Sequence, residues 1–266
     1  LAEAFSGGVL AWVLTILVTP FFEMVFDVAS IYRLLELSDL NSPLLKKLAE
    51  KSSGTFYHSL TVSNLAAAAA EAIGANSLLA RVGACYHDLG KMFRPQYFVE
   101  NQTGGENPHD ALTPPMSSHI LRSHIREGIE IAKSYDLPQQ VIDLIPQHHG
   151  TSVMNFFYSK EIRNGKEKET PLSQEFFRYE GPKPLTVEAA ILMISDSAEA
   201  TFRILKNPSY LRVEEMVREI VQAKFADGQF DECPITVKEL NKIIHALTNC
   251  LVGASHHRIE YPPKAG

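Results

Sequence analysis

The chain has 266 residues, of which 45% are hydrophobic and 21% are charged, a composition that can build a substantial core and excludes a disordered protein. Its formal net charge of -6, with no long run of Lys or Arg, argues against a partner that is a nucleic acid polymer. Cys85, Cys233 and Cys250 are scattered and odd in number, which favours a reduced intracellular compartment over a disulfide scaffold.

The N-terminus carries an uncharged stretch of 19 residues between Glu3 and Glu23, AFSGGVLAWVLTILVTPFF, about the length that crosses a bilayer. The acidic start argues against a signal peptide. We therefore expect residues 1–26 to be the C-terminal end of a transmembrane region, with the cell membrane as the location and the rest of the chain in the cytoplasm. A buried core helix is the alternative, because Pro20 and Glu23 weaken the span.

The remainder reads as helical. A connecting helix is expected over residues 27–40 and one main domain over residues 41–266. Helical periodicity predicts helices over 56–73, 77–90, 117–135, 138–149, 185–206, 211–226 and 236–252. Because no alternating strand pattern is present, the predicted fold class is all-α. Residues 93–116 and 159–184 are rich in Pro, Gly or charge and predict long loops, the first of them a lid or binding loop.

Histidines and aspartates stand out against these helices. His58 shares the core-facing stripe of its helix with Leu65. The pair His87 and Asp88 closes the next apolar helix, and Gly90 reads as its stop signal. Burying such ionisable groups is costly unless they are paired or bind a metal. Some compensating interaction is therefore expected at both places.

Ionisable side chains occur on apolar helices at three further places. His124 lies one turn before Gly128, which we interpret as leaving room for an ion beside the imidazole. His148 and His149 end another apolar helix, and Asp196 is a single carboxylate in an apolar turn. A lone inward histidine is more often a hydrogen-bonded core residue, and Asp196 alone could be a hydrogen-bond acceptor. Seven such groups together are hard to satisfy by hydrogen bonds and favour metal binding.

The types of ligand limit which metal ions are expected. Imidazole and carboxylate without thiolate suit Fe, Mn, Zn, Co or Ni, whereas Mg and Ca prefer oxygen shells. Seven ligands exceed what one ion needs, so we expect two ions about 3.5 to 4 Å apart that share one carboxylate. A water between such ions is deprotonated near neutral pH and can attack a phosphodiester. Lys91 follows directly and could stabilise phosphate charge, although a solvated lysine at a helix end is its ordinary interpretation.

The order of His58, His87, Asp88 and a distant Asp196 on helices resembles the HD-domain phosphohydrolase superfamily. Six motifs resemble more narrowly the membrane-anchored HD phosphodiesterases of the PgpH type: GTFYHS, HDLGKM, ENQTGGENPHD, IPQHHGT, FRYEGPKP and SHHRIEYP. These enzymes carry several transmembrane helices before a cytoplasmic HD domain. The resemblance spans about residues 20–263, nearly the whole chain.

This resemblance implies the fold, the activity and the roles of the residues. The fold would be an HD helical bundle, and the activity would be hydrolysis of cyclic di-AMP to pApA. The first metal would be held by His58, His87, Asp88 and Asp196, and the second by Asp88, His124, His148 and His149, with Fe or Mn favoured. Asp88 would bridge the two ions. Asp88 and Lys91 are the expected catalytic residues. Position alone, apart from the resemblance, makes Lys91 a candidate contact for a phosphate of the substrate, Arg203 a weaker candidate for its second phosphate, and Asn107 a possible contact for a base or ribose.

Alternatives stay open at this point. Other HD proteins hydrolyse cyclic di-GMP, guanosine tetraphosphate or deoxynucleoside triphosphates, and the ligand set alone cannot choose among them. The Gly-Tyr-Pro motif of the cyclic di-GMP branch is missing after His149, where the chain reads GTSVMNFFYSK. A nucleotide sensor without turnover is the other alternative, although intact ligands and Lys91 favour an enzyme. Asn101, Gln102 and His109 are, like Asn107, possible contacts for a base or ribose, although polar loop residues are more often only solvated. His119 is expected to be a non-ligand.

Overall fold

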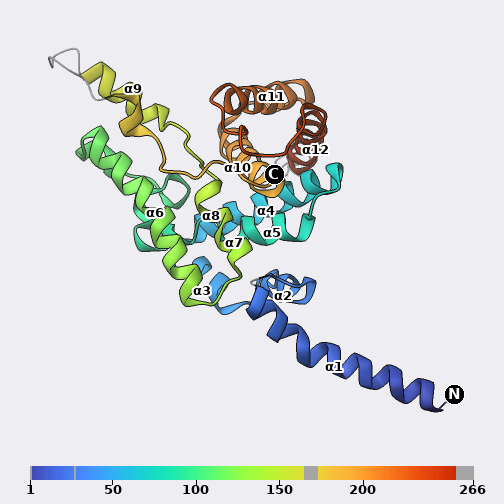
Figure 1. Cartoon of the computed structure of the whole chain (residues 1–266). Coiled ribbons are helices and arrows are strands. Elements are labelled where there is room, and N and C mark those ends of the chain that lie inside the picture. Colours follow the sequence, from blue (N-terminus) through green and yellow to red (C-terminus); the bar gives the residue numbers. More distant parts are fainter. Residues whose placement is uncertain (1, 27, 165–172, 256–266) are drawn as a thin grey trace, which may run out of the picture.

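The computed structural model describes residues 2–26, 28–164 and 173–255, and these segments are almost entirely helical (Figure 1). Among the described residues, the β structure is limited to one isolated antiparallel bridge between Val153 and Arg178. The predicted all-α class is confirmed. Each predicted helix is present, with shifts at the ends and one division described below.

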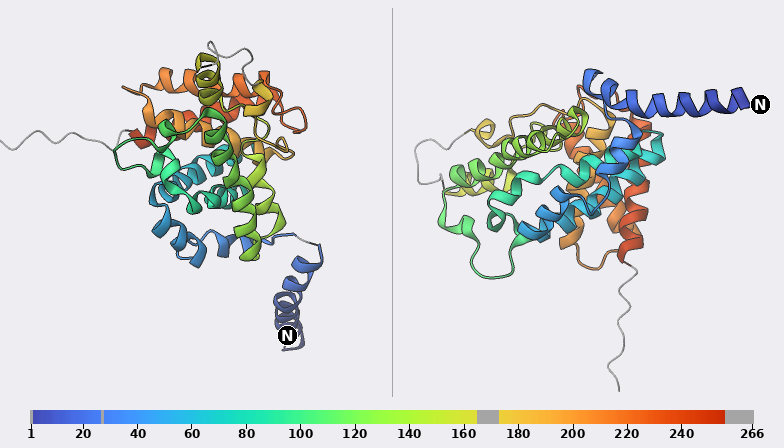
Figure 2. Two further views of the ribbon diagram at one scale, coloured as in Figure 1. Left: turned by 90° about the vertical axis from the view of Figure 1, so that its left-hand side faces the viewer. Right: turned by 90° about the horizontal axis from the view of Figure 1, so that it is seen from below.

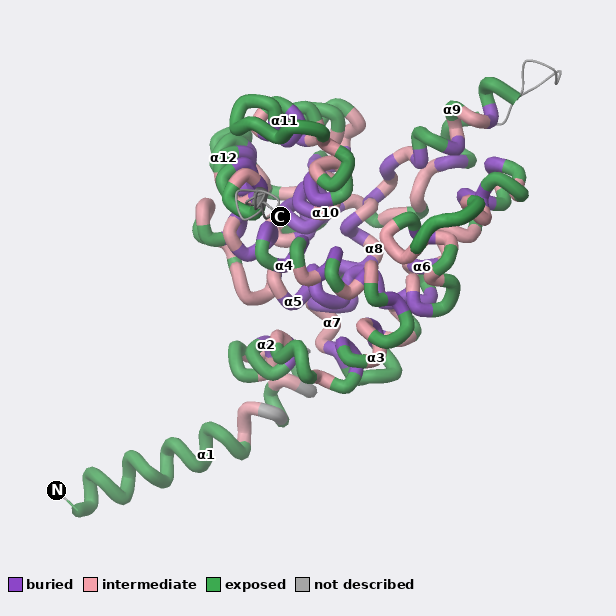
Figure 3. Tube along the Cα trace, turned by 180° about the vertical axis from the view of Figure 1, so that it is seen from behind, coloured by how far each residue is buried: buried purple, intermediate pink, exposed green. Residues whose placement is uncertain are grey.

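The N-terminal helix α1, Ala2–Phe26, projects away from the helical body (Figures 1 and 2) and is exposed along most of its length (Figure 3). Within the described residues it is the one helix long and apolar enough to cross a membrane, over Ala2–Glu23. It leads into α2, Ile31–Leu37, and α3, Pro43–Lys51. Ser30 and Ser42 cap these two helices, because each side chain accepts a backbone N–H of the first turn.

The body consists of longer helices joined by short connections. They are α4 Ser53–Ile73, α5 Ser77–Tyr86, α6 Pro114–Ser134, α7 Gln139–Ile142, α8 Leu144–Gln147, α10 Val187–Ile204, α11 Tyr210–Ala226 and α12 Val237–Ser255. The single helix predicted over 138–149 is divided into α7 and α8. Pro146 explains the division, because it has no N–H for the carbonyl of Ile142 and its ring crowds that carbonyl.

Two segments predicted as loops contain short helices. Residues 89–111 form four short 3₁₀ turns, Leu89–Phe93, Pro95–Tyr97, Val99–Asn101 and Pro108–Ala111. The loop predicted over 159–184 begins inside α9, Asn155–Asn164, and includes a 3₁₀ turn at Gln174–Phe177. Phe157 and Glu161 lie one turn apart and are both buried, and Phe157 packs with Phe177. This tertiary packing stabilises a helix that the charged composition does not predict.

Buried apolar side chains form two large clusters. One joins α4, α10, α11 and α12 and includes Val62, Leu192 and Leu247. The other joins α2, α3, α5, α7 and α8 and includes Leu48 and Ile145. Figure 3 shows the buried residues concentrated where α4, α5, α8 and α10 meet. These helices therefore pack on one another in one buried region. His58 lies on α4, and His87 and His148 follow the ends of α5 and α8.

A close backbone contact joins the segment after α5 to α6. A Cβ atom on Gly90 would lie 1.9 Å from the carbonyl oxygen of His124. From the other side, a Cβ atom on Gly128 would lie 3.3 Å from the backbone nitrogen of Gly90. The interpretation of Gly128 as space for an ion was therefore wrong, since that space holds the backbone of Gly90. Gly90, expected as the stop signal of its helix, does not adopt the left-handed conformation, whereas Gly150 does, with φ +52°.

Candidate metal site

The first group of candidate ligands comes from three parts of the chain. His58 lies on α4, His87 and Asp88 follow the end of α5, and Asp196 lies on α10. The Nε2 atom of His58 is 2.9 Å from Asp196 Oδ1, and that of His87 is 3.7 Å from the same oxygen. Ligand atoms of His58, His87 and Asp88 all lie within 4.8 Å of one another. The structure brings all four residues together.

The second group is made of histidines alone. His124 lies on α6, and His148 and His149 follow α8. One ring nitrogen from each lies within 4.8 Å of the other two. His124 and His148 are fully buried, and His149 is partly exposed. This is a second place where three donors could hold one cation.

Asp88 lies between the two groups, and each of its oxygens faces one of them. Oδ2 is 3.1 Å from His87 Nε2 and 3.7 Å from His58 Nε2. Oδ1 is 3.5 Å from His124 Nε2 and 3.8 Å from His148 Nε2. A carboxylate in this position can bridge two cations.

Several of these donor atoms are buried without a hydrogen-bond partner. They are Nε2 of His87, His124 and His148 and both carboxylate oxygens of Asp88. Buried polar atoms in folded proteins are nearly always hydrogen-bonded, so five orphans in one place need an explanation. The short distances among them, and the 2.7 Å ion pair between Lys91 Nζ and Asp88 Oδ2, do not meet hydrogen-bond geometry. Divalent cations would satisfy all five, and the donor set therefore fits metal ions.

The imidazoles are oriented through their other nitrogen. The Nδ1 atom of His87 donates to the carbonyl of Ala84 at 2.8 Å, three residues earlier in the chain. His124 and His148 make the corresponding bonds to the carbonyls of Leu121 and Ile145. A proton held on Nδ1 leaves the Nε2 lone pair free, the arrangement that metal-binding histidines usually show. His58 is held instead by Glu199, which lies 2.5 Å from its Nδ1.

Electrostatics separates the histidines into two kinds. Burial lowers the pKa of His124 to about 4 and that of His148 to about 3, and it lowers the pKa of His149 well below its usual value. Burial also opposes the protonation of His58 and His87, but the neighbouring carboxylates outweigh it and raise their pKa values to about 9 and about 10. The neutral rings are ready ligands. The raised pKa values of His58 and His87 show that the carboxylates around them favour positive charge at this place, which a bound cation would also supply.

Lys91 is enclosed by acidic groups. Its Nζ lies 2.7 Å from Asp88 Oδ2 and 2.9 Å from Glu100 Oε1. Burial alone would lower the pKa of Lys91, but these carboxylates raise it, so the side chain stays charged. Sequence reasoning missed Glu100, since nothing distinguishes it from other polar residues of its loop. Thr55 holds the same loop, because its hydroxyl donates to Glu100 and its backbone N–H to Asn101 Oδ1.

Arg203 is connected to the site through Glu199, a residue that was not predicted from the sequence. Its Nη2 donates to both oxygens of Glu199, at 2.7 and 2.8 Å. Glu199 in turn contacts His58, so Arg203 stands behind that histidine. The position of Glu199, three residues after Asp196, places both carboxylates on one helix face. That spacing could have identified it from the sequence.

A cavity of about 290 Å³ opens beside the two groups. It is lined by His58, Lys91, Phe98, Val99, Glu100, Leu121, His124, His149, Tyr179, Asp196, Glu199, Ala200, Arg203 and Ile204. Apolar side chains, two cations (Lys91 and Arg203) and three carboxylates line this cavity. With metal ions bound to offset the carboxylates, it would suit an anionic molecule that carries an apolar ring.

Other predicted residues lie elsewhere. Asn107 does not line this cavity, and its Oδ1 accepts from the backbone N–H of His109 and caps a 3₁₀ turn. Asn101 is bonded to Thr55, and His109 Nε2 lies 2.9 Å from the carbonyl of Tyr97. Gln102 donates to the carbonyl of Gln96. These four side chains support the loop. His119 is exposed, as expected of a non-ligand, whereas most of the SHHRIEYP motif lies outside the described residues.

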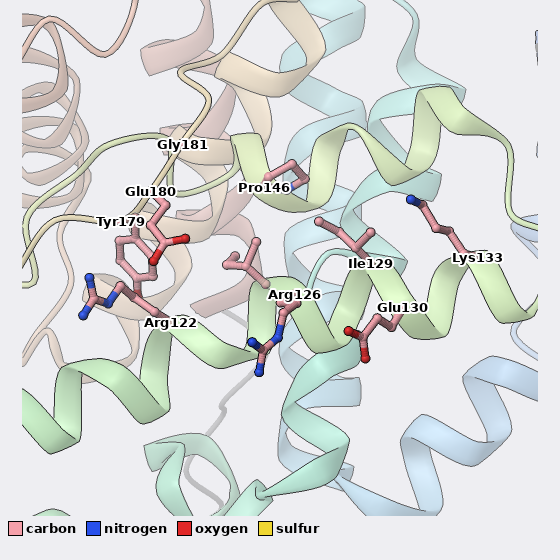
Figure 4. Close-up of a pocket in the computed structure, with 10 residues that line it drawn as sticks. Arg122, Arg126, Ile129, Glu130, Lys133, Pro146, Tyr179, Glu180 and Gly181 are labelled. Atoms are coloured by element: carbon pink, nitrogen blue, oxygen red, sulfur yellow. The ribbon is translucent and has the colours of Figure 1, made fainter.

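Tyr179 separates this cavity from a larger one outside it. The outer cavity, of about 430 Å³, lies between α6 and the segment 179–181 and is lined in part by Arg122, Arg126 and Lys133 (Figure 4). Tyr179 lines both cavities. The outer cavity contains none of the candidate ligands, so the chemistry belongs to the smaller one.

Comparisons with known proteins agree with this site. A family model described as HD domain matches residues 55–201. The chain is 51% identical over 256 residues to the cyclic-di-AMP phosphodiesterase PgpH of Bacillus subtilis (strain 168). It is 48% identical over 262 residues to the protein of the same name from Listeria monocytogenes serotype 1/2a (strain 10403S). These alignments cover 96% and 98% of this chain but 35% and 36% of the relatives, so the chain spans about a third of their length.

A solved structure extends the comparison. The crystal structure of the L. monocytogenes phosphodiesterase PgpH HD domain in complex with cyclic-di-AMP is similar with a TM-score of 0.76 and 48% sequence identity. The match covers 80% of this chain and 98% of that chain.

Proposed function

The chain belongs to the HD-domain family, and on this premise we propose that it is a metal-dependent phosphodiesterase that hydrolyses cyclic di-AMP to pApA. The proposal is supported by relatives about half identical that carry this activity in their names, and by a similar HD domain solved with cyclic-di-AMP. The same proposal accounts for the buried ligand set, which a purely structural domain would not need.

The position of Asp88 is the observation that carries this proposal. One carboxylate oxygen faces His58 and His87, and the other faces His124 and His148. The buried orphan atoms around it match two divalent cations that share this residue, with Asp196 on one side and His149 on the other. Among the metals that accept imidazole and carboxylate ligands, Fe and Mn are the ions that the resemblance favours.

When bound, such a pair of cations would make a water molecule nucleophilic near neutral pH and neutralise charge on the phosphodiester. The residues of the chain provide the remaining parts. Lys91 keeps a positive charge at the mouth of the ligand set, where it can bind a phosphate oxygen. Phe98 and Leu121 offer apolar walls to a base, and Arg203 offers a second cation.

We also propose the organisation of the longer protein. Residues 1–26 would end a transmembrane region, residues 27–40 would connect it to the body, and residues 41–266 would form the cytoplasmic HD domain at the cell membrane. Support comes from the exposed apolar surface of α1 and from relatives that are about three times longer. Flotation of the chain with phospholipid vesicles, compared with a variant carrying Leu14→Lys and Leu17→Lys on α1, tests the anchor. Equal flotation of the two would contradict it.

The activity is tested with purified protein, Mn²⁺ and a panel of cyclic di-AMP, cyclic di-GMP and guanosine tetraphosphate. We expect pApA from cyclic di-AMP, much slower turnover of the others, and no turnover by Asp88→Ala. Preference for another nucleotide would assign the domain to a different HD activity. Binding of cyclic di-AMP without any product, in protein shown to contain metal, would support a sensor and contradict the proposal.

A further inference from the structure

His149 differs from the other candidate histidines in how its ring is held. His87, His124 and His148 are each anchored through Nδ1 to a carbonyl three residues earlier, and His58 is anchored by Glu199. Within the described part of the chain, the ring of His149 forms no hydrogen bond. It is also the one ligand candidate of its group that is partly exposed. Some other contact must therefore fix its orientation.

Tyr179 provides that contact. The rings of His149 and Tyr179 are stacked, with centroids 4.1 Å apart and planes 18° from parallel. The ring of His148 lies 3.9 Å away at 42°, and that of His124 meets His149 edge to face at 5.3 Å. Contacts between rings of this kind are worth about 0.5 to 1.5 kcal/mol beyond the area they bury, so they favour this orientation of His149 without any hydrogen bond. The stacking thus orients His149, as hydrogen bonds to backbone carbonyl groups orient the other three histidines that follow or lie on helices α5, α6 and α8.

Backbone contacts explain why Tyr179 lies over the ring of His149. The bridge between Val153 and Arg178 joins its segment to the turn that follows His149. The backbone N–H of Tyr179 donates to the carbonyl of Ser152 at 3.0 Å. The guanidinium of Arg178 donates to the carbonyl of Thr151 at 2.8 Å. Tyr179 is therefore tied to the same few residues that carry the imidazole it covers.

The turn itself is held rigidly. Gly150 adopts φ +52°, which positions Thr151 against α11 and the segment that follows it. The side chain of Gln229, which is fully buried, accepts from Thr151 N at 2.9 Å and donates to Thr151 Oγ1 at 3.0 Å. The stacked pair is thus fixed relative to the helices, and its geometry does not depend on a free loop.

We propose that Tyr179 is a positioning residue that orients the imidazole of His149 toward the second cation. This inference rests on the two-ion site proposed above. The ring is the part that acts, since the hydroxyl forms no hydrogen bond within the described residues. Removing the ring therefore weakens the binding of the second ion. Binding of the first ion is unaffected, because the ring of Tyr179 contacts none of His58, His87 and Asp196.

Three variants separate the ring from the hydroxyl and from general packing. Tyr179→Leu removes the ring, and Tyr179→Phe keeps it without the hydroxyl. Tyr158→Leu is the matched control, because Tyr158 packs in the same small cluster with Phe177 and touches no candidate ligand. Metal-free protein is titrated with Mn²⁺, and free Mn²⁺ is counted by electron paramagnetic resonance, which gives the number of bound ions and the affinity of each.

We expect two ions in the unmodified chain, in Tyr179→Phe and in Tyr158→Leu. Tyr179→Leu should bind the first ion normally and the second about 10 to 100 times more weakly, the usual effect of losing a group that orients a ligand. Unchanged affinity of the second ion in Tyr179→Leu, or an equal loss in Tyr179→Phe, would overturn the inference. Should thermal melting show that Tyr179→Leu does not fold, Tyr179→Met replaces it with the same expectation. A single ion in the unmodified chain would instead refute the two-ion function.

Discussion

Replacing Gly90 by alanine should damage both stability and catalysis. The new Cβ would lie 1.9 Å from the carbonyl oxygen of His124 and 2.7 Å from the backbone nitrogen of Gly128. Ordinary contact begins near 3.4 Å, so the two backbone segments must separate by about 1.5 Å. Neither atom belongs to a flexible side chain, and the backbone that moves is that of a candidate ligand.

The structure sets the size of both effects. Overpacking usually costs about 1 to 3 kcal/mol of unfolding free energy, and a contact between backbones belongs at about the upper value. The shift also carries His124 away from Asp88, whose Oδ1 lies 3.5 Å from its Nε2. A displacement of about 1 Å at a reacting centre can lower the rate about 100-fold. We expect Gly90→Ala to lose about 3 kcal/mol of unfolding free energy. We also expect it to hydrolyse cyclic di-AMP at least about 100-fold more slowly.

Gly128→Ala is the matched control, because it adds the same atom to the other side of the same contact. Its nearest neighbours lie at 3.3 Å, and alanine favours a helix interior over glycine by about 0.5 to 1 kcal/mol. We expect it to be close to the unmodified chain in both assays. Urea denaturation of metal-free protein and hydrolysis with saturating Mn²⁺ measure the two effects. Equal behaviour of the two alanine variants would refute the reasoning.

Three further predictions follow from the site. Asp88→Ala should abolish turnover more completely than Lys91→Ala, since it removes a ligand shared by two ions, and comparable residual rates would contradict the bridging role. Glu199→Gln should weaken the first ion about 10 to 100-fold by loosening His58, with the second ion unaffected in a Mn²⁺ titration. The pKa of His58 is raised from 6.5 to about 9. Its stabilising contribution is therefore complete below pH 6.5 and lost toward pH 9. Metal-free protein should unfold at lower urea at pH 9 than at pH 6.5, and His58→Gln should reduce this difference.

Much of the candidate site could be predicted because its residues carry local signals. His58 occupies a helix stripe, and His87 with Asp88 and His148 with His149 are adjacent pairs at helix ends. These patterns depend on a few neighbouring residues, and the structure brings all of them together. The helices follow for the same reason, since apolar periodicity is local.

The missed features depend on contacts distant in the chain. Glu100 reaches Lys91 from a loop without periodicity, and Tyr179 meets His149 only because two short segments pair. Gly128 was misinterpreted since the sequence does not show that the backbone of Gly90 fills the space beside it. Helix α9 was missed because its stability comes from packing on Phe177. Asn107 caps a turn of its own loop, and its contact with substrate stays a prediction.

A crystal structure of the Mn²⁺-loaded chain, with anomalous diffraction measured at the manganese edge, tests the central claim most directly. Two anomalous peaks about 3.5 to 4 Å apart, each within bonding distance of a different oxygen of Asp88, are the predicted result. A single peak, or two peaks of which only one contacts Asp88, would contradict the account.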